Sequence, residues 1–395
     1  MKLIAQNFLG LERVAWEPGG VCLVVGPNGS GKTSLLQAFA FLRNAFTHSI
    51  PRAVEYLGGA RGLKRRGVAT DAPVLLAVEV EDLRWELELS VEGGAVGEFP
   101  GERLNIGDEV VLRRVPFSSE WSLGAERISD RLEDEPRTCL RAAWERGSRP
   151  ARWSPLTDAI QGMRIYNQKW SVPRLWDAAL PSTTNVFLNV TGRNLFSVLS
   201  NWRAAPRRHR NQYEWVRDKA RLAFYDIFDD LEIESQGDTV GVRVFSPGSE
   251  EGLPVRRAAD GLIVGLLHLA AVAGAQPGAL VTLDEMENQL HPHAIRVILA
   301  AMRELAEERD LTVALTTHSP VLMNEFEHHV DQFFVTEPGR DRTPVRLDDL
   351  HDPRYLSQFA LGDLFERLKF GAPPDVQGSG PGHAGPGPEA PDTSG

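Results

Sequence analysis

The chain has 395 residues and is 42% hydrophobic, which is enough for a sizeable core in one large or two modest domains. Its formal net charge of −11 excludes a uniformly basic nucleic-acid coat protein but leaves room for a local basic groove. The two cysteines, Cys22 and Cys139, have no metal-type spacing and predict no disulfide framework, as in a reducing cytoplasm.

No signal peptide is recognisable at the N-terminus. The longest apolar run begins at Gly261 and is too short and too interrupted by glycine to span a bilayer. We therefore expect a soluble, cytoplasmic protein without membrane contact.

The first predicted elements are a buried strand at 21–25, a glycine-rich turn, and a helix at 32–45. The turn, "GPNGSGKT", matches G-x-x-x-x-G-K-[ST] in full. Glycines let successive backbone N–H groups face phosphate oxygens, and the following helix adds its unpaired N-terminal donors. An ordinary glycine-rich turn is the alternative, which the complete pattern between a strand and a helix disfavours.

This loop predicts a nucleotide site for ATP with Mg²⁺. Lys32 is expected to contact the β and γ phosphates, and the Thr33 hydroxyl is expected to ligate Mg²⁺. The predicted nucleotide-binding residues are Gly26, Asn28, Gly29, Ser30, Gly31, Lys32, Thr33 and Ser34.

The middle of the chain is only partly interpretable. Residues 74–91 alternate between apolar and polar side chains, which predicts an antiparallel hairpin, whereas residues 95–205 show no assignable periodicity. Apolar residues at helical spacing predict one amphipathic helix through Tyr213, Val216, Ala220, Phe224, Ile227 and Leu231.

The C-terminal part alternates between strands and helices. The segment "GLIVGLLHLAAVAG" predicts an apolar helix, and "ALVTL", "LTVAL" and "DQFFV" predict short buried strands. This alternation favours an α/β fold with a parallel sheet covered on both faces. Residues 371–395, rich in proline and glycine, predict a disordered tail.

Two of these strands end in polar residues. Asp284 and Glu285 follow the strand at 279–283, and ligands bind at the carboxyl ends of strands in parallel sheets. Asp284 is therefore expected to hold Mg²⁺ with Thr33, and Glu285 is expected to act as the general base on water. The alternative is an exposed acidic pair without a catalytic role, which the phosphate loop upstream disfavours. His318 ends the next strand, where it would contact the γ-phosphate or the attacking water, or else form a structural hydrogen bond.

Three segments together resemble a known family. "GPNGSGKTS", "LVTLDEMENQLHP" and "TTHSP" resemble Walker A, Walker B and the switch of ABC-type ATPase heads in the SMC, RecF and OLD groups. The chain is most similar to the small OLD-like or RecF-like AAA-type ATPases, over about residues 1–370. The resemblance implies a P-loop NTPase with an ABC-ATPase-like head, a mostly parallel sheet, an antiparallel β-subdomain and a helical lid insertion.

The resemblance also implies a domain layout and a dimer. The ATPase core would comprise 1–50 and 255–370, with the β-subdomain at 51–95 and the lid at 96–254. In this family each ATP is held by one subunit and covered by a signature segment of the second. The matching signature residues here are Ala259, Asp260 and Gly261, in "RRAADGLIVGLLHL".

Several positions depart from the family pattern. Ala259 stands where a serine hydroxyl is expected, which removes one hydrogen bond to the γ-phosphate in trans, and Leu262 replaces a threonine. Arg256 and Arg257 would either compensate or be solvated surface charges. Met286 replaces a common proline, and Gln168 is only a candidate for the Q-loop glutamine.

Three functions remain open at this point. The first is an ATP-hydrolysing, dimerising switch that acts in DNA repair or phage defence on DNA, on a separately encoded effector such as a nuclease, or on both. The second is a non-catalytic ATP sensor or scaffold, which Ala259 and the missing Q-loop motivate. The third, the ATPase subunit of a transporter, is disfavoured because the signature is not L-S-G-G-Q. The chain after His318 is expected to be too short for the Toprim nuclease domain of OLD proteins.

Other polar groups carry weaker signals. His291 and His293 flank a proline, but no third metal ligand is near, so we do not expect a metal site. Two basic clusters are either solvated surface, which we favour for each alone, or DNA contacts. They comprise Arg61, Lys64, Arg65 and Arg66, and then Arg203, Arg207, Arg208, His209 and Arg210 with the aromatic neighbours Trp202 and Tyr213.

Overall fold

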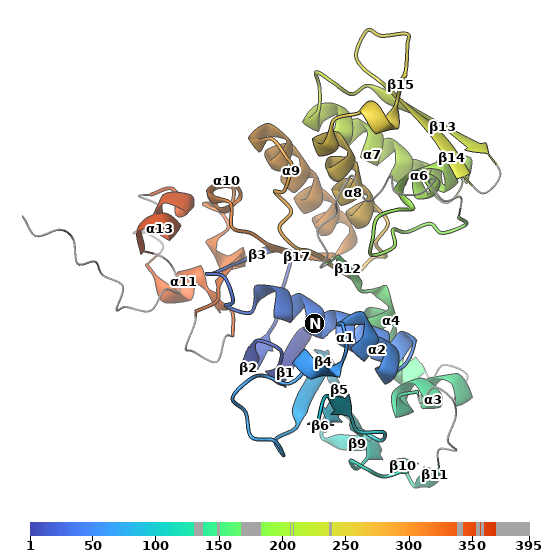
Figure 1. Ribbon diagram of the computed structural model, residues 1–395, viewed down its shortest axis with the longest axis vertical. Helices are drawn as coiled ribbons and strands as arrows, with labels where there is room; N and C mark the ends of the chain where they lie inside the picture. Colours follow the sequence, from blue (N-terminus) through green and yellow to red (C-terminus); the bar gives the residue numbers. More distant parts are fainter. Residues whose placement is uncertain are drawn as a thin grey trace, which may run out of the picture.

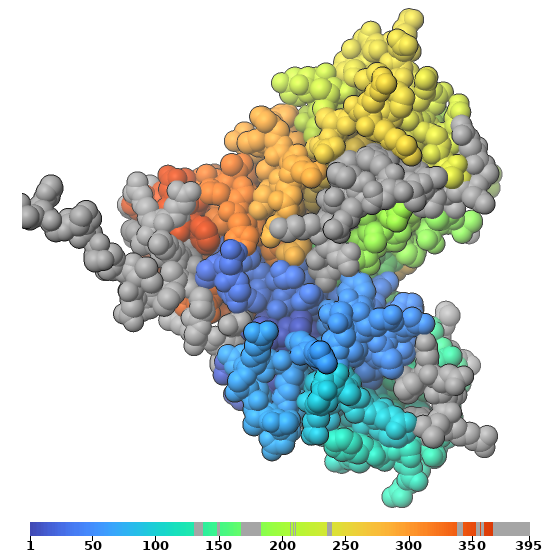
Figure 2. All heavy atoms as spheres, viewed as in Figure 1, coloured from blue at the N-terminus to red at the C-terminus, as the bar shows by residue number. Residues whose placement is uncertain are grey.

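The computed structural model describes residues 1–129, 137–147, 151–166, 183–205, 207, 209–236, 239–337, 343–352, 356 and 359–368. The molecule is elongated (Figure 1). N-terminal elements form one end, the segments from α6 to β15 form the other, and the C-terminal helices lie at the side of the middle. The space-filling view shows the same two ends as separate blue-to-cyan and green-to-yellow masses (Figure 2). Gln168 and the tail at 371–395 fall outside the described residues.

An eight-stranded antiparallel sheet forms the N-terminal end, in the order β11-β10-β9-β8-β5-β4-β1-β2. The predicted hairpin is confirmed, because β4 and β5 pair with Val78 opposite Trp85. The sheet is larger than the segment 51–95 expected for it, since it also takes in strands from both sides of that segment; the domain boundaries themselves stay a prediction. Its strands are β1 (Lys2–Phe8), β2 (Leu11–Trp16), β4 (Val74–Val80), β5 (Leu83–Leu89), β8 (Gly101–Ile106), β9 (Glu109–Arg114), β10 (Glu120–Leu123) and β11 (Glu126–Ser129).

A six-stranded sheet crosses the middle of the molecule, in the order β12-β16-β17-β3-β18-β19. Its first five strands run parallel, and only β19 at the edge is antiparallel. The predicted α/β fold with a mostly parallel sheet is therefore confirmed. The strands are β3 (Val21–Val25), β12 (Arg164–Tyr166), β16 (Leu280–Leu283), β17 (Thr312–Thr316), β18 (Phe333–Val335) and β19 (Val345–Arg346).

Alternation along the parallel strands divides the interior into two cores, because successive side chains point to opposite faces. Leu23, Val281 and Val313 belong to one core, with the helices of the second half of the chain. Cys22 and Ala314 belong to the other, with helix α1 and the antiparallel sheet. Cys22 is thus a buried small hydrophobe, as its apolar strand predicted.

Helix α1 (Lys32–Thr47) is buried because it lies in the core shared by both sheets. Phe46, for example, contacts the rings of Trp85 and Trp144. The helix runs two residues past the predicted end at Ala45.

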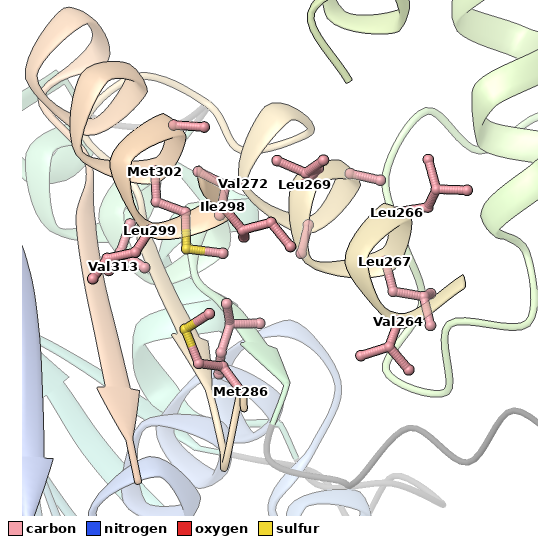
Figure 3. Packing of buried hydrophobic residues seen from close by; sticks show 14 of the residues in the cluster. Val264, Leu266, Leu267, Leu269, Val272, Met286, Ile298, Leu299, Met302 and Val313 are labelled. Atoms are coloured by element: carbon pink, nitrogen blue, oxygen red, sulfur yellow. The ribbon is translucent and has the colours of Figure 1, made fainter. Parts of the chain in front are cut away.

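Helices α8 (Asp260–Ala273) and α9 (Pro292–Arg309) cover the other face of the parallel sheet. Figure 3 shows Met286 entering the same cluster as Leu299, Met302 and Val313 from the loop after β16. Met286 is 0% exposed, so the residue that replaces the family's usual proline anchors this loop in the core.

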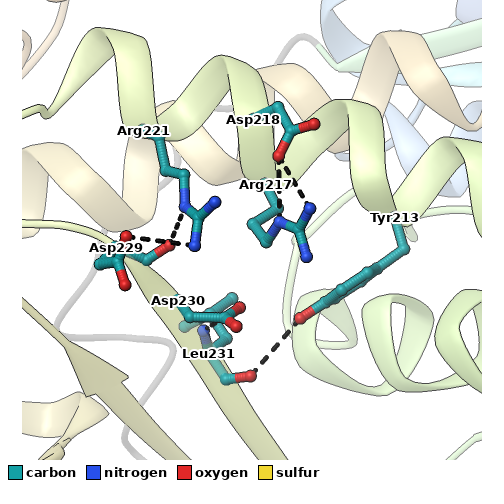
Figure 4. Close-up of polar contacts among 7 residues, drawn as sticks. All are labelled: Tyr213, Arg217, Asp218, Arg221, Asp229, Asp230 and Leu231. Atoms are coloured by element: carbon teal, nitrogen blue, oxygen red, sulfur yellow. Dashed lines mark hydrogen bonds and ion pairs between the residues drawn. The ribbon is translucent and has the colours of Figure 1, made fainter. Parts of the chain in front are cut away.

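The predicted amphipathic helix ends earlier than expected. Helix α7 spans Arg210–Ala223, Ile227 is 37% exposed in a turn, and Leu231 belongs to strand β13. Leu231 keeps the helical spacing by chance: it lies in a strand, but that strand packs on the same core as α7. Figure 4 shows the contacts that join the two elements: the Tyr213 hydroxyl donates to the Leu231 carbonyl at 3.4 Å, and Arg221 pairs with Asp229 at 3.1 Å.

The remaining elements complete both ends. Among the described helices, none is long and apolar enough to cross a bilayer. The other helices are α2 (Ile50–Tyr56), α3 (Cys139–Arg146), α4 (Ser154–Gly162), α6 (Leu195–Ala204), α10 (Pro320–Asn324), α11 (Leu347–Leu350) and α13 (Leu361–Leu368). The other strands are β6 (Val91–Glu92), β7 (Ala95–Val96), β13 (Asp230–Gln236), β14 (Thr239–Phe245) and β15 (Leu253–Pro254).

Candidate nucleotide-binding site

The glycine-rich loop joins β3 to α1 and depends on backbone conformations that favour glycine. Gly26, Gly29 and Gly31 have φ values of 153°, 76° and 105°. At Gly26 a Cβ would lie 2.3 Å from Thr336 Oγ1, so no larger residue fits there. The Lys32 ammonium donates to the carbonyls of Gly26 at 2.8 Å and Pro27 at 3.2 Å. The loop therefore curls around the ammonium, as a phosphate-binding loop requires.

Some residues of the loop are exposed, whereas the hydroxyls of its serines are hydrogen-bonded within the protein. Asn28 and Gly29 are exposed at the tip. Ser30 is fully buried, and its hydroxyl lies 2.7 Å from Thr336 Oγ1. The Ser34 hydroxyl accepts from the backbone N–H of Gly10 at 3.3 Å. The hydroxyls of Ser30 and Ser34, both predicted to contact nucleotide, thus hold the loop onto β18 and the β1–β2 turn.

Asp284 connects the phosphate loop with the neighbouring strands. It follows β16, and its Oδ2 accepts from the Thr33 hydroxyl at 3.2 Å. Its Oδ1 accepts from the hydroxyl of Thr316, the last residue of β17. The two residues predicted to hold Mg²⁺ are therefore brought together from positions 251 residues apart in the chain.

Glu285 sits beside Asp284 in a left-handed conformation, with φ of 50°. This conformation is uncommon for a residue other than glycine and marks a constrained position. Its backbone N–H donates to Thr316 Oγ1 at 3.0 Å, and its Oε2 accepts from Asn288 Nδ2 at 3.1 Å. The carboxylate is thereby oriented at the carboxyl edge of the sheet.

His318 follows β17 at the same edge. Its backbone N–H donates to Glu287 Oε1 at 3.0 Å, which ties the switch segment to the loop after β16. The exposed His318 side chain is close enough to interact electrostatically with Lys32, Asp284 and Glu285. The structure therefore brings together Walker A, the carboxylate pair and His318.

Burial governs the titration of this cluster. It lowers the pKa of Lys32 to about 8, although the nearby carboxylates act in the opposite direction. Burial also raises the pKa of Asp284, against the hydrogen bond from Thr316. The pKa of His318 is lowered, first because its exposed ring is still partly desolvated by the protein and then by the charge of Lys32, so the imidazole is neutral at pH 7.

The oxygen donors fit Mg²⁺. Thr33 Oγ1 and Asp284 Oδ2 face each other across 3.2 Å, and hydroxyl and carboxylate oxygens are ligands that Mg²⁺ accepts, usually with several waters retained. Bound there, Mg²⁺ would neutralise phosphate charge.

The signature segment lies at the start of α8. Ala259 is the N-cap and makes no side-chain cap hydrogen bond, and Ala259 and Asp260 are exposed. At Gly261 a Cβ would lie 2.6 Å from the Gln289 carbonyl oxygen, so the helix start packs directly on the loop after Walker B. Within the described residues, no hydrogen bond or ion pair joins the signature to the phosphate loop of the same chain. Arg256 and Arg257 are exposed in the turn before it.

The secondary candidates have structural roles. His291 caps α9 by accepting from the His293 N–H at 3.3 Å, and His293 contacts the Leu222 carbonyl oxygen at 3.2 Å. No group of three or more potential metal-ligating side chains occurs in the described part of the chain.

The basic clusters are partly engaged by the protein itself. In the first, Arg65 pairs with Glu12 at 2.7 Å and Lys64 donates to the Thr70 carbonyl, whereas Arg61 and Arg66 are exposed. In the second, Trp202 and Tyr213 are 0% and 6% exposed, so neither aromatic ring is available to stack on a base. Arg208 falls outside the described residues.

Sequence reasoning missed three site residues: Thr316, Glu287 and Thr336. Each of these polar side chains lies at or beyond the end of an apolar strand, and this position is the sequence feature that could have identified it as a site residue. Thr336 is the clearest case, because its hydroxyl donates to the Val25 carbonyl at 3.0 Å and also meets Ser30. Only the strand order places β18 beside β3 and so reveals this contact.

Comparison with known proteins identifies one family. Residues 21–324 match the family model described as "AAA domain, putative AbiEii toxin, Type IV TA system". This range includes the phosphate loop, the signature, the carboxylate pair and His318.

Individual relatives share different parts of the chain. It is 40% identical to DNA replication and repair protein RecF of Chromohalobacter salexigens over 100 residues, which are 24% of this chain and 27% of RecF. It is 21% identical to OLD nuclease of Thermus scotoductus over 402 residues, covering 93% of this chain and 68% of that protein. Among solved structures, the SMC head bound to the C-terminal winged-helix domain of ScpA aligns with a TM-score of 0.48 and 12% identity, over 89% of this chain and 99% of that one.

Proposed function

Because the chain belongs to this AAA-domain family, a group of P-loop ATPases that resemble the RecF and OLD proteins, we propose that it is an ATP-hydrolysing, dimerising switch. The hydrogen bond between Thr33 Oγ1 and Asp284 Oδ2 carries this proposal. It joins the Walker A hydroxyl to the Walker B carboxylate, the two groups that a P-loop NTPase uses to hold Mg²⁺.

The proposed hydrolysis divides the work among the chain's own residues. The loop N–H groups and Lys32 bind the triphosphate, and Glu285, oriented by Asn288 and Thr316, accepts a proton from the attacking water. The neutral His318 imidazole is placed to hydrogen-bond the γ-phosphate or that water. In a dimer, the exposed start of α8 would cover the nucleotide of the second copy.

The test is steady-state phosphate release. We expect Lys32→Ala to abolish turnover and Glu285→Gln to slow it by about 100-fold or more, because general-base catalysis contributes about 10²–10⁴-fold. Glu327→Gln, which changes an exposed glutamate away from the cluster, is the matched control and should leave turnover unchanged. Full activity of Glu285→Gln would refute the assigned base.

We further propose that the switch acts on DNA, on a separate effector such as a nuclease, or on both, in repair or phage defence. The names of the relatives, DNA replication and repair protein RecF and OLD nuclease, support this direction. The exposed Arg61 and Arg66 are the side chains we would assign to phosphate contact. Replacing both by Gln should weaken DNA binding and flatten its dependence on salt concentration; an unchanged salt slope would remove DNA contact from this surface.

A non-catalytic ATP sensor is the second candidate, and one observation favours it. Ala259 offers no hydroxyl at the N-cap of the signature helix. A sensor would bind ATP through Lys32 yet release no phosphate, even with DNA present. Measurable turnover that Lys32→Ala abolishes would exclude it.

A further inference from the structure

A small pocket lies between helix α1, strand β12 and residues 187–190. Its volume is about 160 Å³, below the roughly 300–1,000 Å³ of sites for drug-sized ligands. The pocket therefore suits a small ion rather than a nucleotide. It is separate from the phosphate loop, which begins before α1.

Two arginines give this pocket its charge. Arg43 comes from α1 and Arg164 begins β12, and Arg164 is only 8% exposed. No carboxylate occurs among the described lining residues; the other polar side chains are those of asparagines and tyrosines. Burial lowers the pKa of both guanidinium groups, and for Arg43 the second cause is Arg164 itself.

The guanidinium groups are incompletely hydrogen-bonded. Arg164 Nη1 donates to the carbonyls of Gln161 and Met163, each at 3.0 Å, and its guanidinium lies 4.5 Å from the centre of the Phe187 ring. Within the described residues, the contact of Arg43 Nη1 is a long one, 3.4 Å, to Asn44 Oδ1. In both residues Nε is buried and has no partner within the described part of the chain. Two like charges with unpaired buried donors are unfavourable unless an anion joins them.

We propose that Arg43 and Arg164 bind a single oxyanion of the phosphate class. Guanidinium groups present paired N–H donors that match the oxygens of phosphate, and two such groups facing one small pocket favour a doubly charged anion. The anion is either free inorganic phosphate or a phosphate group of a nucleic-acid end, and the experiment distinguishes these sources.

The pocket is joined to the nucleotide site by strand β12. The carbonyl of Tyr166 accepts from the Asp284 N–H at 3.1 Å, and the Tyr166 ring lines the pocket, where its hydroxyl donates to the Leu188 carbonyl at 3.3 Å. An anion bound at Arg164 would therefore hold the strand that supports Asp284. The binding itself does not depend on ATP hydrolysis.

The experiment measures thermal unfolding of the full chain in Lys32→Ala, which removes phosphate binding at the P-loop lysine. At constant ionic strength, sodium phosphate replaces chloride, and in a second arm a short DNA duplex with terminal phosphates is added. We expect a saturable rise in melting temperature of about 5 °C at 100 times the Kd.

Adding Arg43→Gln to this background should abolish the rise. In chloride alone, Arg43→Gln should melt no lower than its parent, because it removes a repulsive charge that makes one long hydrogen bond. This second readout separates an anion site from a structural role, which would lower the melting temperature. Arg52→Gln, at an exposed position on the nearby α2, is the matched control and should keep the rise.

A rise with phosphate that Arg43→Gln abolishes supports the site with free phosphate as ligand. A rise only with the duplex, lost in Arg43→Gln, supports it with nucleic-acid phosphate as ligand. No rise in either arm, or a rise that persists in Arg43→Gln, would overturn the proposal.

Discussion

Thr316 is bonded to both residues of the carboxylate pair. Its hydroxyl donates to Asp284 Oδ1 and accepts from the Glu285 N–H. A single side chain from β17 therefore sets the position of the proposed Mg²⁺ ligand and of the proposed base. The left-handed backbone at Glu285 is held by this contact and by Asn288.

Thr316→Val should separate this role from packing, since valine has nearly the same shape without the hydroxyl. We expect a loss of about 1–3 kcal/mol of stability, because a part-buried carboxylate oxygen and a part-buried N–H lose their partner, and slower turnover. Urea unfolding and phosphate release measure the two effects. Thr316→Ser keeps the hydroxyl and should lie close to wild type; equal losses in Val and Ser would contradict the assignment.

Lys32 predicts a pH dependence of ATP binding. Its pKa in the free protein is lowered to about 8 by burial, so the ammonium loses its proton above that pH. Bound triphosphate favours the charged form, and binding above pH 8 must take up a proton. The apparent Kd for ATP should therefore rise with pH above about 8, approaching tenfold per unit. Calorimetry across this range measures the slope, and Lys32→Arg, which stays charged, should not show it.

The contacts of helix α8 with neighbouring elements determine the position of the signature segment. The start of α8 packs on the loop after Walker B at Gly261, while the rest of the helix is buried in the core with α9. The buried side chain of Met286 anchors the same loop in the core. The signature and the loop after Walker B are therefore in direct backbone contact at Gly261.

Gly261→Ala should disturb this contact. Its Cβ would approach the Gln289 carbonyl oxygen to 2.6 Å, and backbone must shift to relieve the overlap. We expect a stability loss of about 1–3 kcal/mol and weaker ATP-dependent association, measured by urea unfolding and light scattering. Gly62→Ala is the control, since a Cβ there meets nothing within 4 Å. Normal association of Gly261→Ala would argue against a role for this contact.

In the molecule as a whole, α1 lies between the parallel and the antiparallel sheet. The proposed site lies at the carboxyl edge of the parallel sheet. Helix α8, which begins with the signature, lies beside α7 and α9 in the other half of the molecule (Figure 1), and Ala259 and Asp260 are exposed. A second copy would complete the site by covering the nucleotide.

The mass of Glu285→Gln in solution tests this arrangement. We expect a monomer without nucleotide and a dimer with Mg-ATP by light scattering, because slowed hydrolysis preserves the ATP-bound form. Lys32→Ala should stay monomeric under both conditions. A mass that does not change with Mg-ATP would contradict ATP-driven dimerisation, whether the particle is a monomer or a constant oligomer.

The sequence by itself determined the local features. The phosphate loop, the carboxylate pair and His318 could be located because each is a short motif at a strand end, while their roles stay predictions. The parallel sheet followed from strand–helix alternation. The hairpin at 74–91 was readable because its period is two. The end of α7 was misjudged because Leu231 kept the helical period by chance while lying in β13.

Only the tertiary structure decided the contacts between distant segments. Ser30 meets Thr336 across 306 residues of sequence, and Thr33 meets Asp284 across 251. Arg43 and Arg164 likewise line one pocket only because β12 lies at the edge of the sheet beside β16. Such contacts leave no periodic trace in the chain, because strand order and register, rather than local spacing, place their side chains together.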